Sequence, residues 1–490
     1  MGTYEALKPH KVFEYFYKIN QVPRGSGEEE AIGRALEAHG RKMGLETKRD
    51  SAGNVVLRKP ASPGYENAPT VTIQGHMDMV CQKTPESTHD FSKDPIAMEI
   101  DGDWLHAKDT TLGADDGIGV AMGLALLDED FVHPPLEVLV TTAEETGMDG
   151  AIGLAPDFLT GSYLLNIDSE EEGFVTVSCA GGSTGVLSLP LQRKAPTPSD
   201  VFSIRVDGMR GGHSGMEILK VSHSAIKVLT EFLLKLDAAI SFDLHAFHAG
   251  EKHNAIPNEA EAIVSVPKEQ VPALLHELET LRAAQVEAIL KFEPDIRFAW
   301  KEIQTAQAPL TDETKTALLN LLQLLPHGVN TMMADRSVVE SSDNLASAHT
   351  DETDMTMILS VRSATEARRA ELQDKVRALA QLFGAACHFR DGYPAWEYRA
   401  DSPLRERFLA QYREMFGKEA EVLIIHAGLE CALFAQTHPH LDMISFGPDI
   451  KGAHTTRERL SIGSTERTYE LLKAIVTSIA KEYVDESKRD

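Results

Sequence analysis

The chain has 490 residues, of which 42% are apolar and 25% are charged, and it carries a formal net charge of −27 at pH 7. A chain of this length and composition is expected to form two or three domains of an ordinary globular protein. The strong negative charge argues against nucleic acids and anionic membranes as binding partners.

The cysteine pattern and the apolar segments predict a cytoplasmic protein. The four cysteines are far apart and show no paired spacing, which argues against a disulfide framework and against a cysteine-based zinc site. The chain opens without a basic stretch followed by an apolar one, so no secretory signal is expected. No run of 18 or more apolar residues occurs, so no segment is expected to span a membrane.

The first eighty residues predict two helices followed by short strands. Residues 8–45 read as two helices broken at Pro23–Gly27, and strand candidates follow at 47–50 and 54–58. Val71 and Ile73 then mark a buried strand that stops at Gly75. His76 and Asp78 come directly after it, two positions apart, so in an extended chain their side chains point the same way.

Two more buried strands in the first 190 residues also end on acidic groups. Residues 138–142 lead into Glu144 and Glu145, and residues 164–168 end on Asp168. Between the strands, Asp115 precedes an apolar helix at 120–127 that is rich in alanine and glycine. Strands alternating with helices predict an α/β fold with a mainly parallel sheet, whose site lies along one edge.

The middle of the chain differs in composition and in its pattern of predicted strands and helices, which indicates an inserted domain. Prolines at 190, 196 and 198 suggest a linker, after which strands alternate with long amphipathic helices up to about Tyr393. The expected helices lie at 222–236, 269–290, 311–325 and 364–382. After Trp396 the earlier pattern resumes, with helices at 404–416, 428–436 and 465–483 and a strand at 443–446. We therefore expect a catalytic domain, residues 1–190 and 396–490, interrupted by an α+β domain at 191–395.

The acidic and imidazole groups at the strand ends form a candidate metal site. Taken singly, Glu144–Glu145 is commonly a solvated helix start and Asp115–Asp116 a turn, but their joint placement favours metal binding. Nitrogen and oxygen ligands without cysteine suit zinc, or else manganese or cobalt. Two ions that share a bridging carboxylate would acidify water and polarise a carbonyl, and a further carboxylate would serve as general base. The candidate residues are His76, Asp78, Asp115, Glu144, Glu145 and Asp168, with His454 from a late loop.

The motifs that contain these residues resemble the di-zinc aminopeptidase and carboxypeptidase superfamily in order and spacing. They are Gly75–Val80, Thr111–Gly117, Ala143–Gly147, Asn166–Asp168 and Gly452–His454. More narrowly, three stretches resemble the aminoacyl-histidine dipeptidases, a group that includes peptidase D and the bacterial carnosinases. These stretches are Thr110–Asp115, Gly211–Gly215 and His426–Cys431.

The resemblance implies a role for each residue of the candidate metal site. Asp115 would bridge two zinc ions, and its peptide bond to Asp116 would be cis. One ion would take His76 and Asp168 as further ligands, and the other Glu145 and His454. Glu144 would act as general base, while Asp78 would accept from His76 and fix its tautomer.

The resemblance also implies that the inserted domain is a lid over the substrate. His213, between glycines, would stabilise the oxyanion. Asn254 and Arg362 would hold the substrate's terminal carboxylate, for which the planar guanidinium is suited, and Gly428 would offer backbone contacts. Composition alone would leave His213 a loop histidine and Arg362 a surface cation.

The activity implied is hydrolysis of dipeptides, notably Xaa-His dipeptides such as carnosine, by a homodimer whose contacts lie in the lid. Two alternatives remain open from the sequence. One is an amidohydrolase of the same scaffold that deacylates N-acyl amino acids, which lack the free α-amine of a dipeptide. The other is a metal-binding relative without catalysis.

Overall fold

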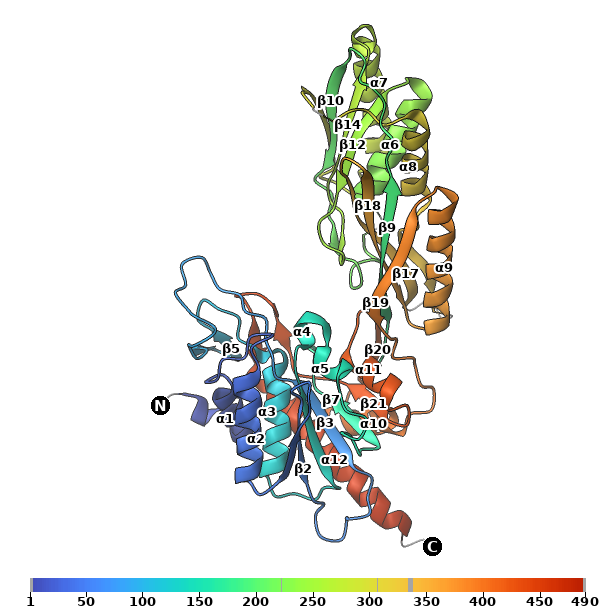
Figure 1. Ribbon diagram of the computed structural model, residues 1–490. Coiled ribbons are helices and arrows are strands. Elements are labelled where there is room, and N and C mark those ends of the chain that lie inside the picture. The colour runs from blue at the N-terminus through green and yellow to red at the C-terminus, as the bar shows by residue number, and fades with distance from the viewer. Residues whose placement is uncertain (1–2, 222, 306, 334–337, 488–490) are drawn as a thin grey trace. The chain divides into compact units, whose positions relative to one another are not determined.

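The computed structural model describes residues 3–221, 223–305, 307–333 and 338–487 (Figure 1). The contacts divide the chain into two compact units. The first unit comprises the described residues of Met1–Ser178, Tyr398–Ile424 and Leu429–Asp490, and the second those of Cys179–Glu397 and Ile425–Gly428. The first break falls between Ser178 and Cys179, earlier than the expected 190/191, because strand β9 (Gly181–Pro190) pairs along its length with β18 (Asp354–Ser363) of the second unit.

The sheet of the first unit has eight strands in the order β1-β2-β6-β3-β7-β21-β8-β20. Its four central strands, β6, β3, β7 and β21, run parallel, whereas β1, β2 and β8 pair antiparallel with their neighbours. The α/β class is therefore confirmed, but the sheet is mixed and parallel only at its centre. The strands are β1 (Glu46–Arg49), β2 (Val55–Lys59), β3 (Val71–His76), β6 (Leu136–Thr141), β7 (Tyr163–Asn166), β8 (Phe174–Cys179), β20 (Glu421–Ile425) and β21 (Asp442–Ser445).

Helices pack on this sheet close to their predicted positions. Helix α3 lies against β3 and β6, and a Cβ on its Gly123 would lie 2.9 Å from Val138, so the small residues of α3 allow this close approach. The helices of the unit are η1 (Thr3–Ala6), α1 (His10–Ile19), α2 (Glu30–Lys42), α3 (Ala114–Asp128), α4 (Glu144–Gly147), α5 (Asp149–Ile152), α10 (Pro403–Phe416), α11 (Glu430–Thr437) and α12 (Ile462–Ser487). A smaller sheet holds β22 (Ile450–Lys451), β23 (Arg459–Ser461), β5 (Trp104–Ala107) and β4 (Met98–Asp101).

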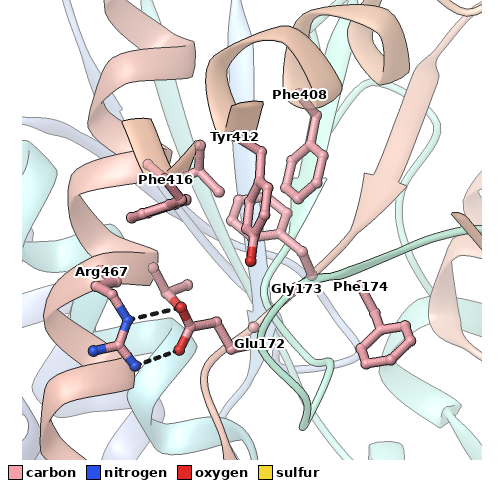
Figure 2. Close-up of a pocket in the computed structure, with 11 residues that line it drawn as sticks. Glu172, Gly173, Phe174, Phe408, Tyr412, Phe416 and Arg467 are labelled. Carbon is pink, nitrogen blue, oxygen red and sulfur yellow. Dashed lines mark hydrogen bonds and ion pairs between the residues drawn. The ribbon is translucent and has the colours of Figure 1, made fainter. Parts of the chain in front are cut away.

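A small cavity beside α10 belongs to the core of the first unit. Tyr412 and neighbouring aromatic side chains line it, and the Arg467 guanidinium donates to both carboxylate oxygens of Glu172, at 2.7 and 2.6 Å (Figure 2). Its volume of ≈ 10 Å³ is about the minimum that can hold a single water molecule. It is therefore too small for a substrate.

Among its described residues, the second unit has a nine-stranded antiparallel sheet, four α-helices and one short 3₁₀ helix. The strand order is β15-β10-β14-β12-β17-β18-β9-β19, with β16 paired to β17. Its further strands are β10 (Asp200–Asp207), β12 (Asp243–Ala249), β14 (Ala260–Val266), β15 (Arg297–Ile303), β16 (Gly328–Met332), β17 (Val339–Thr350) and β19 (Ala386–Tyr393). The helices are α6 (Ala225–Ala239), η2 (Lys268–Gln270), α7 (Val271–Ile289), α8 (Asp312–Leu324) and α9 (Glu366–Leu382), and β11 (Gly212–His213) pairs with β13 (Ala255–Ile256).

The two faces of the second sheet differ in character. Leu187, Ile204, Val264 and Leu359 belong to one buried cluster with apolar side chains of helices α6 to α9. The opposite side chains of the same strands are mostly polar and include Arg362. We call these the apolar face and the polar face. Among the described residues of the chain, no helix is long and apolar enough to cross a membrane.

Asp343 is a buried carboxyl on the apolar face, and it predicts a pH-dependent stability. Asn330 donates to its Oδ2, but its Oδ1 is buried without a partner. Burial raises the pKa of Asp343 to about 7, against the lowering effect of Asn330, Lys375 and Arg368. Because this pKa exceeds that of an unfolded aspartate, ~3.9, the charged form favours unfolding, and stability falls as the pH rises from about 4 to 7.

We therefore expect Asp343→Asn to raise the free energy of unfolding by about 2–4 kcal/mol at pH 8 and to change it little at pH 4. Urea unfolding at the two pH values measures this. Asp374→Asn, at an exposed position of α9, is the control. Equal effects of Asp343→Asn at both pH values would contradict the prediction.

Candidate metal centre and substrate-binding residues

Three neighbouring parallel strands bring the candidate ligands to one edge of the first sheet. β3 ends at His76, β6 ends three residues before Glu144, and β7 ends two residues before Asp168. Since β6, β3 and β7 are adjacent and parallel, their carboxyl ends meet at the same edge. Ala143, directly before Glu144, and the candidate ligand His454 both have left-handed backbone, with φ 52° and 63°. Such values are uncommon outside glycine and cluster at functional sites.

Two groups of potential ligands share Asp115. His76 Nε2 lies 3.0 Å from Asp115 Oδ1 and 3.4 Å from Asp168 Oδ1. His454 Nε2 lies 2.9 Å from Asp115 Oδ2 and 3.0 Å from Glu145 Oε2. Within each group one ligand atom from each residue lies within 4.8 Å of the others. Asp115 thus offers one oxygen to each group, and its peptide bond to Asp116 is cis.

The electrostatics of this cluster fit divalent cations. Burial and nearby Asp115 and Glu145 raise the pKa of Asp168 to about 7, against the effect of His76. Hydrogen bonds with Asp115 and Glu145 raise the pKa of His454 to about 11. Glu145 Oε1 is buried without a partner. Crowded carboxylates, an unpaired oxygen and two imidazoles form the donor set that zinc or manganese accepts.

Asp78 holds both His76 and the start of helix α4. Nδ1 of His76 faces it, 3.2 Å from the backbone oxygen and 3.4 Å from Oδ1, which leaves Nε2 toward the ligand cluster. The backbone N–H groups of Glu144 and Glu145 donate to the Asp78 carboxylate at 3.1 and 3.3 Å, and the Ser26 hydroxyl donates at 2.8 Å. Asp78 therefore holds the backbone of the two glutamates and lies where an N–H at Nδ1 of His76 would donate to it.

Glu144 lies beside the two groups. Burial and the neighbouring carboxylates of Asp168, Glu430 and Glu145 raise the pKa of Glu144 well above its ordinary range, against the effect of His76. One of its oxygens lies within 4.8 Å of ligand atoms of His76 and Glu145. A carboxylate with a raised pKa at this position is suited to accept and return a proton.

Two buried residues that the sequence did not single out support the ligands. The Glu458 carboxylate accepts from the backbone N–H groups of four successive residues, Leu112 to Asp115, at 2.7–3.4 Å. The Arg24 guanidinium donates to the backbone oxygens of Met77, Asp78 and Gly113. No local sequence pattern predicts either residue, because each one forms hydrogen bonds with loops that are distant along the chain.

The second unit brings the predicted substrate-binding residues together on its own. β11, which ends with His213, pairs with β13, directly after Asn254, and the Ser214 N–H donates to the Asn254 oxygen at 2.8 Å. A Cβ on Gly215 would lie 3.2 Å from the His213 ring and 3.4 Å from the Arg362 guanidinium carbon. The same Cβ would lie only 2.4 Å from the backbone oxygen of His426, so glycine at 215 allows the backbone of His426 to pack here and keeps His213 and Arg362 close to the same point.

His213 is arranged as a hydrogen-bond donor through Nε2. Its Nδ1 accepts from the backbone N–H groups of Gly215 and Met216, at 3.3 and 3.1 Å. Burial and the nearby Arg362 lower the pKa of His213, so that the neutral ring prevails at pH 7. A neutral imidazole that accepts at Nδ1 carries its proton on Nε2.

Tyr393 is a further residue of this group that sequence reasoning missed. The Arg362 guanidinium donates to the Tyr393 hydroxyl. A Cβ on Gly428 or on Gly182 would lie 2.6 Å from the Tyr393 side chain. The ring thus occupies the space that a side chain at Gly428 would need, which is a physical reason for glycine at this position.

Comparisons with known proteins agree with this fold. Residues 72–478 match peptidase family M20/M25/M40. The chain is 36% identical over 483 residues to the cytosol non-specific dipeptidase of Escherichia coli (strain K12), covering 98% of this chain and 99% of that protein. The crystal structure of aminoacylhistidine dipeptidase from Vibrio alginolyticus is similar with a TM-score of 0.90 and 36% identity, over 97% of this chain and 98% of that chain.

A more distant structure shares the fold alone. Aminopeptidase PepT from Bacillus cereus ATCC 10987 is similar with a TM-score of 0.56 at 16% identity, over 97% of this chain and 99% of that chain. The predicted relationship to di-zinc peptidases is confirmed at the level of the family. The extent of the match and the 36% identity over nearly the whole chain show that this protein belongs to peptidase family M20/M25/M40.

Proposed function

We propose that the chain is a metal-dependent dipeptidase that hydrolyses the peptide bond of dipeptides, Xaa-His dipeptides of the carnosine type among them. The observation that carries the proposal is Asp115, whose two oxygens face one ligand group each. His76 and Asp168 would hold one ion, and Glu145 and His454 the other. Two divalent cations bound there would supply Lewis acidity toward water and toward the scissile carbonyl.

The residues of the first unit would move the proton. Glu144 would take a proton from the attacking water and deliver it to the leaving amine, for which its raised pKa is suited. Asp78 would keep Nδ1 of His76 protonated and Nε2 directed at the ion. It would also hold Glu144 in place through the backbone hydrogen bond.

The residues of the second unit would bind substrate as a lid. His213 would donate from Nε2 to the developing oxyanion. Arg362 and Asn254 would hold the terminal carboxylate, with Gly428 nearby. Closure of a lid over a short substrate would explain a limit to dipeptides.

Zinc, a cytoplasmic location and a homodimer complete the proposal. The mixed histidine and carboxylate donors support zinc, with manganese or cobalt as alternatives. The name of the E. coli relative supports the cytoplasm. The homodimer is proposed by analogy with the family. Light scattering of the purified protein measures its molar mass, and elemental analysis measures its metal content.

A panel of substrates tests the function. Carnosine, Ala-Ala, a tripeptide and an N-acetyl amino acid are each offered with zinc and after chelation. We expect cleavage of the two dipeptides only, lost on chelation and restored by metal. Cleavage of the acylated substrate alone would instead indicate an amidohydrolase, and no cleavage of any substrate would indicate a metal-binding relative without catalysis.

We expect Tyr393→Phe to raise KM for dipeptides about three- to tenfold, with kcat little changed. Its hydroxyl orients Arg362, and loss of one such hydrogen bond costs about 0.5–1.5 kcal/mol. Steady-state kinetics on Ala-Ala and on its C-terminal amide measure the effect, which should be absent for the amide. Tyr398→Phe is the control, because the Tyr398 hydroxyl accepts from Arg405 in the first unit. An equal rise for both substrates would contradict the assignment.

A further inference from the structure

The polar face of the second sheet contains a hollow large enough for an amino-acid side chain. Its volume is ≈ 580 Å³, in the range of small-ligand sites. Thr184 of β9, Ile358 of β18 and Arg390 of β19 line it from the sheet, and the loop of residues 251–254 lines it from above the strands. The Ser360 hydroxyl donates to the His253 oxygen at 2.6 Å and so fixes this loop over β18.

The strand register places this hollow next to Arg362. Ile358, Ser360 and Arg362 occupy every second position of β18, so their side chains lie on the same face. Gly182 lies opposite Arg362, while Thr184 lies opposite both Ser360 and Arg390. The row of Thr184 and Arg390 is therefore about 7 Å from the row of Arg362. Asn254, which we propose binds the substrate carboxylate, also lines the hollow.

The lining of the hollow is cationic although the whole chain is strongly acidic. Among the lining residues that the structure describes, Lys252 and Arg390 carry two positive charges and Glu251 carries the one negative charge. Burial and the nearby Arg362 lower the pKa of His253, which is therefore neutral at pH 7. Ile358 adds an apolar surface. A negatively charged side chain would be attracted here, a neutral one accommodated, and a positively charged one repelled.

We propose that this hollow receives the side chain of the substrate's C-terminal residue, and that Lys252 and Arg390 make the enzyme favour acidic over basic residues at that position. The inference rests on the proposed dipeptidase function and names the side chains it prefers. When the terminal carboxylate of the substrate is bound to Arg362, the side chain of its C-terminal residue can reach the neighbouring row of Thr184 and Arg390. A histidine side chain, neutral at pH 7, fits the same lining without a charge penalty.

The ratio of kcat/KM for Ala-Glu to that for Ala-Lys tests the inference. We expect the wild-type ratio to exceed one. Arg390→Gln and Lys252→Gln should each lower it about three- to tenfold, as expected for loss of one charge at this range in a partly exposed site. Arg390→Glu should lower it further. Arg297→Gln removes one positive charge at the exposed β15 edge and should leave the ratio unchanged.

Two results would overturn the inference and are distinguishable. Hydrolysis of both dipeptides with the same ratio in wild type, Arg390→Gln and Lys252→Gln would show that the hollow does not bind the side chain, while the proposed function would stand. Failure of the metal-loaded wild type to cleave any dipeptide would overturn the proposed function itself. Circular dichroism of each variant shows whether the variants are folded.

Discussion

Glu144→Gln is expected to lower kcat for dipeptide hydrolysis roughly 10²–10⁴-fold. Glutamine keeps the size of the side chain but cannot accept the proton of the attacking water. The backbone N–H of residue 144, which donates to Asp78 at 3.1 Å, is unaffected by the change. The ligand groups around Asp115 should therefore persist, and the loss should be chemical rather than structural.

Steady-state kinetics on Ala-Ala, together with elemental analysis of the purified variant, check this expectation. The variant should contain as much metal as the wild type while turning over far more slowly. Glu414→Gln, at an exposed position of α10, is the matched control and should retain full activity. Wild-type turnover by Glu144→Gln would show that another group serves as the base.

The edge of the first sheet could be predicted because its information is local. An apolar strand that stops at His76, Glu144 or Asp168 places those side chains at the carboxyl end, and parallel neighbours then bring them together. The structure adds the division of the candidate ligands into two groups, which local sequence patterns do not predict. His76 and His454 face different oxygens of the same aspartate.

The long strand β17 shows what the sequence could not predict. It contains Ser341, Ser342, Asp343 and Asn344, all buried, so that it shows no alternation of apolar and polar residues. Its strand conformation comes from pairing with β18 and β16 on either side rather than from its own propensity. The polar side chains are tolerated because several of them have specific partners. Ser342 contacts the buried ring of His426, for example, at 2.7 Å.

Residues that act through others were invisible for a related reason. Tyr393 and Arg362 lie on strands that do not pair with each other, on either side of Gly182 in β9. The Tyr393 ring fills the space beside Gly428 only in the folded unit, where these two distant positions come together. A single sequence shows the glycine but not the ring that needs it.

Glu458 connects the two loops that carry Asp115 and His454. Its carboxylate accepts from four consecutive backbone N–H groups, Leu112 to Asp115, at 2.7–3.4 Å. The residue itself is 2% exposed and stands four positions after His454 in the chain. The position of Asp115, which both ligand groups share, thus depends on a side chain that touches neither of the predicted ions.

We therefore expect Glu458→Ala to lower the free energy of unfolding by about 3–5 kcal/mol, because several buried N–H groups lose their acceptor at about 1–3 kcal/mol for each one left unsatisfied. Metal affinity should fall about 10–100-fold, as for other residues that orient ligands. Glu458→Gln, which keeps one acceptor oxygen, should lie between the wild type and Glu458→Ala in both quantities.

Urea unfolding of the metal-free proteins and competition with a zinc chelator measure the two effects separately. Glu466→Ala removes an exposed carboxylate from α12 and should match the wild type in both assays. A Glu458→Ala protein that is less stable but binds zinc as tightly as the wild type would show that the loop keeps its geometry without this carboxylate. Loss of affinity in the folded variant, with an intermediate value for Glu458→Gln, would instead identify Glu458 as the residue that positions Asp115 between the two ions.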